Sequence, residues 1–171
     1  YNDLQSTWNG DVKSNGGYIE NTGGSSWSGD IIANDADHLI NNIGGATWTG
    51  NVQSNEGSIN NDGGTWNGNV LSNNGSIFNT IASTWNGDIT SSGSAWLSGT
   101  VNGAVNNDGG TLYVDNPLSG VTAFTNTGAL SMDDGDPDDV LRAQSWSGTG
   151  VATFDFAPGL GRSDQVVLSG E

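Results

Sequence analysis

The chain has 171 residues, of which 33% are hydrophobic and 13% charged, and its formal net charge is −16. Nineteen acidic residues stand against Lys13, Arg142 and Arg162, so the basic surface that nucleic-acid binding requires is excluded. The same imbalance disfavours anionic glycans and anionic membrane surfaces. The chain has no cysteine and no apolar run long enough to cross a bilayer, so we expect neither disulfides nor membrane insertion.

A tryptophan motif recurs every 18 to 21 residues in the first half of the chain. It reads STWNGDV at 6–12 and GTWNGNV at 64–70, and a second block such as EGSINN at 56–61 follows each copy. The tryptophans of the motif are Trp8, Trp27, Trp48, Trp66 and Trp85. One such unit is too small to bury its own apolar face, so self-similarity at this period predicts a stacked solenoid.

The spacing inside each unit indicates strands rather than helices. Trp66, Gly68 and Val70 alternate with polar residues, and Asn-Gly and Gly-Gly turns separate the apolar segments. Low hydrophobicity with high charge is also a signature of disorder, but disordered tracts do not keep apolar residues in register. We therefore predict an all-β fold, a right-handed parallel β-helix with rungs of about 19 residues. Segment 1–110 would form the tryptophan rungs, and 111–171 a C-terminal cap of the same solenoid.

We interpret the tryptophans as an inward-facing stack, because Trp8 shares a face with Val12. The glycine two residues after each tryptophan would leave room for the indole ring. The alternative is an exposed aromatic stripe on which sugar rings could stack. A column of asparagines, each two residues after an apolar residue, predicts a single structural ladder of side-chain amides, with a polar binding stripe as the alternative. Its members are Asn21, Asn42, Asn61, Asn79, Asn107 and Asn126.

The repeat breaks near residues 91–99. Ile89 and Val105 lie 16 residues apart, whereas Val70 and Ile77 lie 7 apart. Removing 91–99 restores the pattern, because NGAVNNDGG at 102–110 then aligns with EGSINNDGG at 56–64. This alignment predicts an insertion that carries Trp96 and Leu97 out of register, either folded back as a small cluster or exposed as an apolar tip that contacts a partner.

The C-terminal segment carries four further motifs. They are a Gly-x-Leu-x-Met strand at 128–132, Asp-Asp-Val-Leu at 138–141, a Gly-x-Gly-x-x-x-x-Asp-x strand pair at 148–156, and Ser-Asp-x-Val-Val-x-x-Gly at 163–170. This segment resembles the end of the passenger domain of autotransporters, β-helical proteins that Gram-negative bacteria export by type V secretion. The tryptophan rungs also look like passenger repeats, and exported β-helices of the filamentous-haemagglutinin type are the nearest rival family. The resemblance implies a secreted, cell-surface β-helix, concerned with adhesion and virulence, whose C-terminal segment nucleates folding like an autochaperone.

An acidic loop at 133–139 is the one cluster that suggests an ion. Its carboxylates, which are weak calcium candidates, belong to Asp133, Asp134, Asp136, Asp138 and Asp139. Their spacing matches neither an EF-hand nor a nonapeptide calcium roll, so we interpret the segment as a solvated surface loop. No metal or other cofactor is expected.

The sequence does not favour an enzyme. Polysaccharide lyases and hydrolases on β-helices need clustered carboxylates beside basic groups, and here the basic residues are few and scattered. The single histidine, His38, has no nucleophile motif near it. We therefore expect a non-catalytic, monomeric scaffold or stalk for adhesion on the surface of a Gram-negative bacterium, part of a longer protein. Its partner would be a host-cell or matrix protein, a glycan, or another copy, and a polysaccharide-binding or polysaccharide-degrading β-helix is the alternative.

Overall fold

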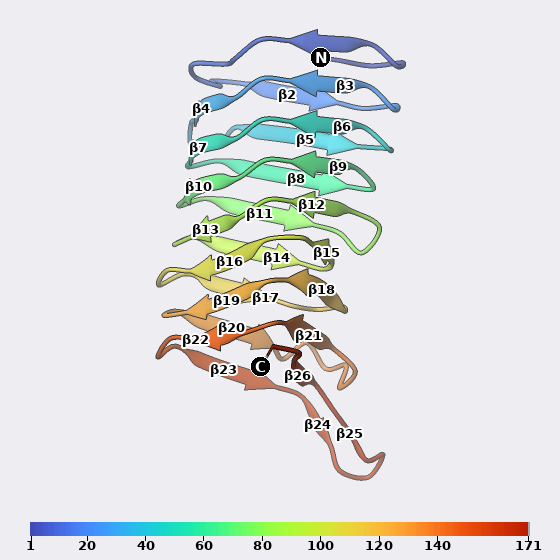
Figure 1. The fold of residues 1–171 in the computed structure, drawn as a ribbon, viewed down its shortest axis with the longest axis vertical. Helices are drawn as coiled ribbons and strands as arrows, with labels where there is room; N and C mark the ends of the chain where they lie inside the picture. Colours follow the sequence, from blue (N-terminus) through green and yellow to red (C-terminus); the bar gives the residue numbers. More distant parts are fainter. Residues whose placement is uncertain (171) are drawn as a thin grey trace.

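The structure is a computed structural model that describes residues 1–170. The chain winds as a parallel β-helix in which each rung lies on the one before it, with the two termini at opposite ends of the stack (Figure 1). All pairings between rungs are parallel, and the described residues contain no helix, hence none that could span a membrane. The predicted fold class is therefore confirmed.

Three parallel sheets run along the stack, and the chain visits them in turn. Sheet 1 consists of β1 (Thr7–Asn9), β3 (Ser26–Ser28), β6 (Thr47–Thr49), β9 (Thr65–Asn67), β12 (Thr84–Asn86), β15 (Gly99–Val101), β18 (Leu118–Val121), β21 (Val140–Ala143) and β26 (Gln165–Leu168). Sheet 2 consists of β4 (Ile31–Asn34), β7 (Val52–Asn55), β10 (Val70–Asn73), β13 (Ile89–Ser91), β16 (Ala104–Asn107), β19 (Ala123–Asn126) and β22 (Trp146–Ser147). Sheet 3 consists of β2 (Tyr18–Asn21), β5 (Leu39–Ile43), β8 (Ser58–Asp62), β11 (Ser76–Asn79), β14 (Ser94–Leu97), β17 (Thr111–Tyr113), β20 (Ala129–Met132) and β23 (Val151–Phe154). An antiparallel hairpin of β24 (Phe156–Ala157) and β25 (Arg162–Ser163) follows β23.

The tryptophans of sheet 1 form a continuous inward stack. Trp27, Trp48, Trp66 and Trp85 are buried, and successive ring centroids lie 4.6–5.0 Å apart. Trp8, in the first rung, has a ring neighbour on one side only and is 46% exposed. The indole N–H groups of three of the buried rings have no hydrogen-bond partner, so ring burial and stacking, rather than hydrogen bonding, hold the column together.

From the second copy of the motif on, the glycine two residues after the tryptophan is required by the backbone of the neighbouring rung rather than by the indole. Gly50 has a φ of 151°, and a Cβ there would lie 2.1 Å from the carbonyl oxygen of Gly29. The next residue then links the rungs: the side chain of Asp30 accepts the backbone N–H of Asn51 at 2.7 Å, and Asn51 accepts that of Asn69 at 2.9 Å. The Trp-x-Gly-Asp/Asn motif thus encodes one corner of the helix.

The asparagines form two ladders, and the prediction of a single ladder is wrong. The first ladder lies at the end of sheet 3 and joins Asn2, Asn21, Asn42, Asn61 and Asn79 through amide hydrogen bonds of 2.7–2.9 Å. The second lies at the end of sheet 2 and contains Asn15, Asn34, Asn55, Asn73, Ser91, Asn107 and Asn126. Asn107 pairs with Ser91 in sheet 2, so the two last predicted members belong to a different column from the first four. In both ladders the amides also donate to turn carbonyls, which fixes the corners.

The C-terminal segment continues the same three sheets, since β17 pairs with both β14 and β20. Its last strands carry exposed apolar side chains, with Val151 66% and Phe156 73% exposed. The hairpin β24–β25 projects beyond the stack (Figure 1). The segment predicted as a cap therefore presents an apolar surface at this end, not the polar face that terminal repeats of solenoids usually have.

We predict that Trp66→Ala lowers the free energy of unfolding by about 3–5 kcal/mol, because it leaves a cavity in the middle of the indole column. Trp8→Ala is the matched control, and its effect should be much smaller, because that ring is half exposed at the end of the stack. Chemical denaturation followed by circular dichroism measures both. Equal losses for the two variants would contradict the inward column.

A second prediction concerns the ladders. Asn61 accepts a hydrogen bond from Asn42 and donates to Asn79 and to the carbonyl of Thr84. Asn61→Ala should cost about 1–3 kcal/mol for each buried group left unpaired. Asn60→Ala, on the outer face of the same strand, should change the free energy of unfolding by less than about 0.5 kcal/mol. Similar denaturation midpoints for the two variants would show that the ladder contributes nothing to stability.

Candidate functional site

The irregularity near residues 91–99 is a shortened rung, so the predicted insertion is wrong. Ser94–Leu97 form β14, which pairs in register with β11 and β17 of sheet 3. A single residue, Ser98, separates β14 from β15, whereas Thr80–Ser83 separate β11 from β12. Together with a sheet 2 strand, β13, that is one residue shorter than β10, this short connection brings Trp85 into register with Val101, 16 residues later. The connection at this corner is shorter than in the preceding rung, and no loop is inserted.

Trp96 and Leu97 point to opposite sides of β14. Leu97 is buried and follows Asn79 in register, so it is a core residue and not the contact residue that the sequence predicted. Trp96 is half-buried on the outer face of sheet 3. It lies there between Phe78 and Tyr113, with ring centroids 4.7 and 4.6 Å away and the ring planes within 9° of parallel. These three residues form what we name the aromatic ladder.

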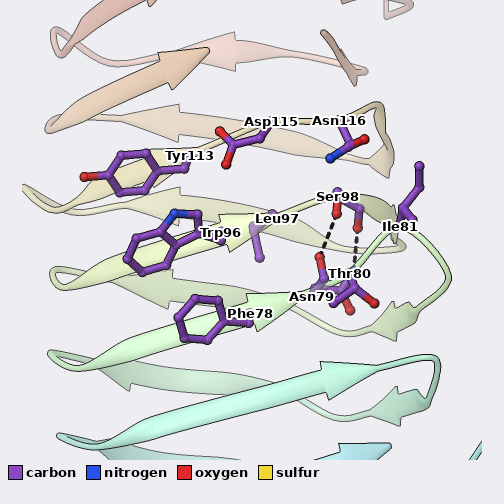
Figure 2. A pocket seen from close by; sticks show the side chains of 10 residues that line it. All are labelled: Phe78, Asn79, Thr80, Ile81, Trp96, Leu97, Ser98, Tyr113, Asp115 and Asn116. Carbon is purple, nitrogen blue, oxygen red and sulfur yellow. Dashed lines mark hydrogen bonds between the residues drawn. The ribbon is translucent and has the colours of Figure 1, made fainter. Parts of the chain in front are cut away.

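The lost corner leaves a groove beside the aromatic ladder (Figure 2). Ser98, which forms the short connection, lies between Thr80 and Ile81 of the rung before and Asp115 and Asn116 of the rung after. The enclosed volume is about 240 Å³. Hydrogen bonds between Ser98 and Asn79, 2.7–3.0 Å long, hold the short connection against the preceding rung. The corners on either side remain full length, so they wall the groove.

A second hollow of about 420 Å³ continues from the aromatic ladder toward the N-terminus. Phe78 and Thr80 line both hollows, and Leu39, Asn41, Ser58 and Asn60 line the second one alone. We name the two together the trough. Asn41 donates to the hydroxyl of Tyr18 at 2.7 Å, but its buried Oδ1 atom has no hydrogen-bond partner. That oxygen is shielded from solvent, so it is an orphaned acceptor inside the wall and not a position that a ligand can reach.

The trough is uncharged apart from one carboxylate. Asp115 is its single ionisable lining residue besides the phenol of Tyr113, and no Lys, Arg or His lines either hollow. Although the Asp115 side chain is exposed, partial loss of hydration around its carboxyl raises its pKa, and the negative charge of Asp134 raises it further. The surface can therefore offer aromatic rings, amides and hydroxyls to a ligand, with little charge.

The acidic loop at 133–139 lies in the connection between β20 and β21. The charge of its Asp134 raises the pKa of Asp115, so the two carboxylates are near enough to interact. Asp138 forms an ion pair with Arg162 of the projecting hairpin, and the Arg162 Nε donates to its Oδ1 at 2.6 Å. Asp155 accepts the backbone N–H of Asp134 at 3.0 Å. Among residues 1–170, no three acidic or histidine side chains come close enough to hold a metal ion. Asp138 and Asp155 thus fix the loop and the hairpin to each other.

Asp139 is the exception to the predicted solvated loop. It is only 4% exposed, and its Oδ2 atom has no hydrogen-bond partner. Burial raises its pKa to about 7, and the carboxylates of Asp134 and Asp164 add to the shift. Its backbone N–H donates to Asp164 at 3.1 Å and its carbonyl accepts from Gln165, so it joins the loop to the last strand. This junction therefore holds a carboxyl whose pKa is raised toward neutral pH.

Comparison with known proteins adds no identity. No protein-family model, no curated protein and no solved structure matches the chain. The fold and the candidate site therefore stand on the chain's own residues.

Sequence reasoning missed Phe78 and Tyr113 as partners of Trp96. The signal was present, since all three are aromatic residues at outward positions of sheet 3 strands. The predicted insertion removed Trp96 from that sheet, and the alignment of 102–110 with 56–64 then hid the match between Trp96 and Tyr113. A count of outward positions on the correct strands would have revealed the row.

We predict that titration of Asp139 lowers the free energy of unfolding as the pH rises from about 4 to about 7. The folded-state pKa lies above the unfolded value, so in this interval the folded state binds more proton than the unfolded state and loses that advantage as the pH rises. The slope from one such group is at most about 1.4 kcal/mol per pH unit. Asp139→Asn should flatten the dependence, whereas Asp133→Asn, at an exposed position of the same loop, should not. Denaturation midpoints at pH 5 and pH 8 give the comparison, and an unchanged difference in Asp139→Asn would contradict the assignment.

Proposed function

We propose that this chain is a non-catalytic β-helical scaffold of an exported bacterial surface protein, which holds an adhesive face in an extended, rigid array. The observation that carries the proposal is the continuity of the stack. Sheets 1 and 3 run from the first rung to the last strands without a break, and even the shortened rung keeps its strand pairings. An array of this kind sets the positions of outward side chains at regular intervals along a rod.

The composition argues against a role in nucleic-acid binding and is compatible with export. The net charge of −16 repels polyanions and other acidic surfaces. The chain has no cysteine, so its fold does not depend on the redox state of its surroundings. The resemblance of 128–170 to autotransporter passengers favours the surface of a Gram-negative bacterium as the location.

The alternative of a polysaccharide-degrading enzyme finds less support at this site. Hydrolysis by a pair of carboxyl groups needs a second acidic residue beside the first. The lining of the trough supplies Asp115 alone, with no basic residue to assist a lyase reaction. The same lining suits a surface that binds without reaction, so polysaccharide binding stays compatible with the scaffold role.

Adhesion of the folded chain tests the proposal directly. Beads coated with the chain should attach to host-cell layers, or to surfaces of matrix proteins or glycans, more strongly than beads coated with an unrelated protein of similar acidic charge. Heat-denatured chain is the second control, because an adhesive face built from stacked rungs disappears on unfolding. Attachment no better than the acidic control on every surface would remove the adhesive role.

The proposal also assigns folding nucleation to the C-terminal segment. Its strand β23 carries the apolar residues Val151 and Phe154. Hydrogen bonds from Asp139 and Asp155 to Asp164 tie the acidic loop and the hairpin to the start of β26. Fragment 111–171 should therefore retain cooperative β-structure on its own, while fragment 1–110 should refold slowly or aggregate through its open edges. Refolding followed by circular dichroism compares the two. Equal refolding rates and yields would leave the scaffold role without a templating end.

A further inference from the structure

The geometry points to a neutral, linear polysaccharide as the ligand of the trough, lying along the helix axis over the outer face of sheet 3. The inference rests on the proposed scaffold role, because the stacked rungs keep the aromatic ladder and the hollows in line. It assigns binding to the aromatic ladder of Phe78, Trp96 and Tyr113, together with the amide of Asn60 and the hydroxyl of Ser58.

The aromatic ladder supplies the apolar part of the site. Its rings are half-buried, and their outer portions line the hollows in a row that follows the axis (Figure 2). Because neighbouring rings stack on one another, the ladder presents mainly its ring edges to the hollows, as one continuous apolar band. The C–H groups on one face of a sugar ring can pack against such a band, and a polymer brings one such face after another along it. Partly exposed apolar groups gathered in one place are typical of binding surfaces.

An amide and a hydroxyl supply the polar part of the site. Asn60 and Ser58 line the second hollow on β8, one strand away from Phe78, and both residues are half-buried. Sugar hydroxyls can donate to the oxygen of the Asn60 amide and accept from its N–H group, since a hydroxyl has both a proton and lone pairs. A purely apolar ligand would leave these groups unpaired, at a cost of about 1–3 kcal/mol each.

Charge selects among polymers. The basic residues Lys13, Arg142 and Arg162 do not line the trough, so nothing there neutralises an anionic sugar, and the net charge of −16 repels one. A cationic peptide would be attracted by that field. However, the lining offers it one carboxylate, Asp115, where several lysines or arginines would each need a partner. A neutral polysaccharide is the ligand whose groups match the rings, amides and hydroxyls of the trough.

The length of the trough agrees with a polymer. From Leu39 and Asn41 on β5 to Tyr113 on β17, it crosses four strand spacings of sheet 3. At about 4.8 Å per spacing this is roughly 19 Å. That span accommodates several sugar rings in a row and exceeds what a monosaccharide could contact, so affinity should rise with chain length.

The test uses the whole chain, the trough variant Trp96→Ala and the control variant Leu71→Ala. Affinity electrophoresis through gels containing neutral β-glucans, mannan or xylan measures binding, with polygalacturonate and heparin as anionic probes and oligolysine as a cationic one. The chain should be retarded by at least one neutral polysaccharide and by neither anionic one, and added salt should leave the retardation unchanged. Trp96→Ala should weaken the apparent affinity at least tenfold. Leu71→Ala, which removes an exposed apolar side chain from sheet 2, should not change it.

Each outcome supports or contradicts the proposed ligand of the trough. Circular dichroism and the melting temperature establish that Trp96→Ala folds, and Asn60→Asp, which adds a charge without loss of volume, serves as a second trough variant. Retardation by none of the neutral polymers, or equal retardation of the wild-type chain and both folded trough variants, would overturn the inference. Salt-sensitive binding of oligolysine alone would do the same and would assign the trough to a basic peptide. Bead adhesion that persists without neutral-sugar binding would leave the scaffold role intact, whereas sugar binding without adhesion would remove that role alone.

Discussion

Every rung of this protein can bury its apolar face only against the rung beside it. This constraint makes the vertical register the quantity on which the rest of the structure depends. Once Trp48 lies on Trp27 and Asn42 on Asn21, each position of the rung repeats as a column along the axis. The columns then supply the stabilising interactions: stacked indoles in sheet 1, amide ladders at two corners, and side-chain acceptors for backbone N–H groups at the third. Because the core is continuous along the helix axis, a core only as wide as one rung is sufficient to hold the stack together.

The same constraint explains how a surface site can arise without an inserted loop. A connection between strands can be shortened at a corner while most of the strand pairing is kept. The short connection between Leu97 and Gly99, in a rung whose sheet 2 strand is also one residue shorter than its neighbour, opens a groove between the corners above and below. The aromatic residues of sheet 3 lie on three successive strands centred on that rung. Groove and aromatic ladder thus depend on one register, the groove through the short connection and the ladder through aromatic residues at matching outward positions.

The C-terminal end is organised differently. Indole stacking stops at Trp85, Val101 follows it in sheet 1, and the last strands leave several apolar side chains exposed. In place of a column, a long acidic connection and a hairpin are fixed by individual contacts, such as the pair of Asp138 with Arg162 and the bonds to Asp164. The raised pKa of Asp139 makes this end sensitive to pH near neutrality, whereas the amide and indole columns have no titratable group. Stability along the rod is therefore not uniform.

The sequence by itself determined the period, the strand content and the inward direction of the tryptophans, because alternation and repeat length are local properties of the chain. It could not determine which sheet a strand joins after the repeat breaks. The segment around Val105 and Asn107 has the apolar-x-Asn spacing of sheet 3 strands such as Ile59 to Asn61, yet it lies in sheet 2. Sheet 2 strands of the earlier rungs have one more residue in that interval, as from Val70 to Asn73, and the register shifts where β10 meets β13. Only pairing with both neighbouring rungs distinguishes the two sheets. That tertiary pairing moved Asn107 and Asn126 to a second ladder, placed Leu97 in the core, and brought Phe78, Trp96 and Tyr113 into one row, because hydrogen bonding between strands, and not local sequence, sets the register of a stack.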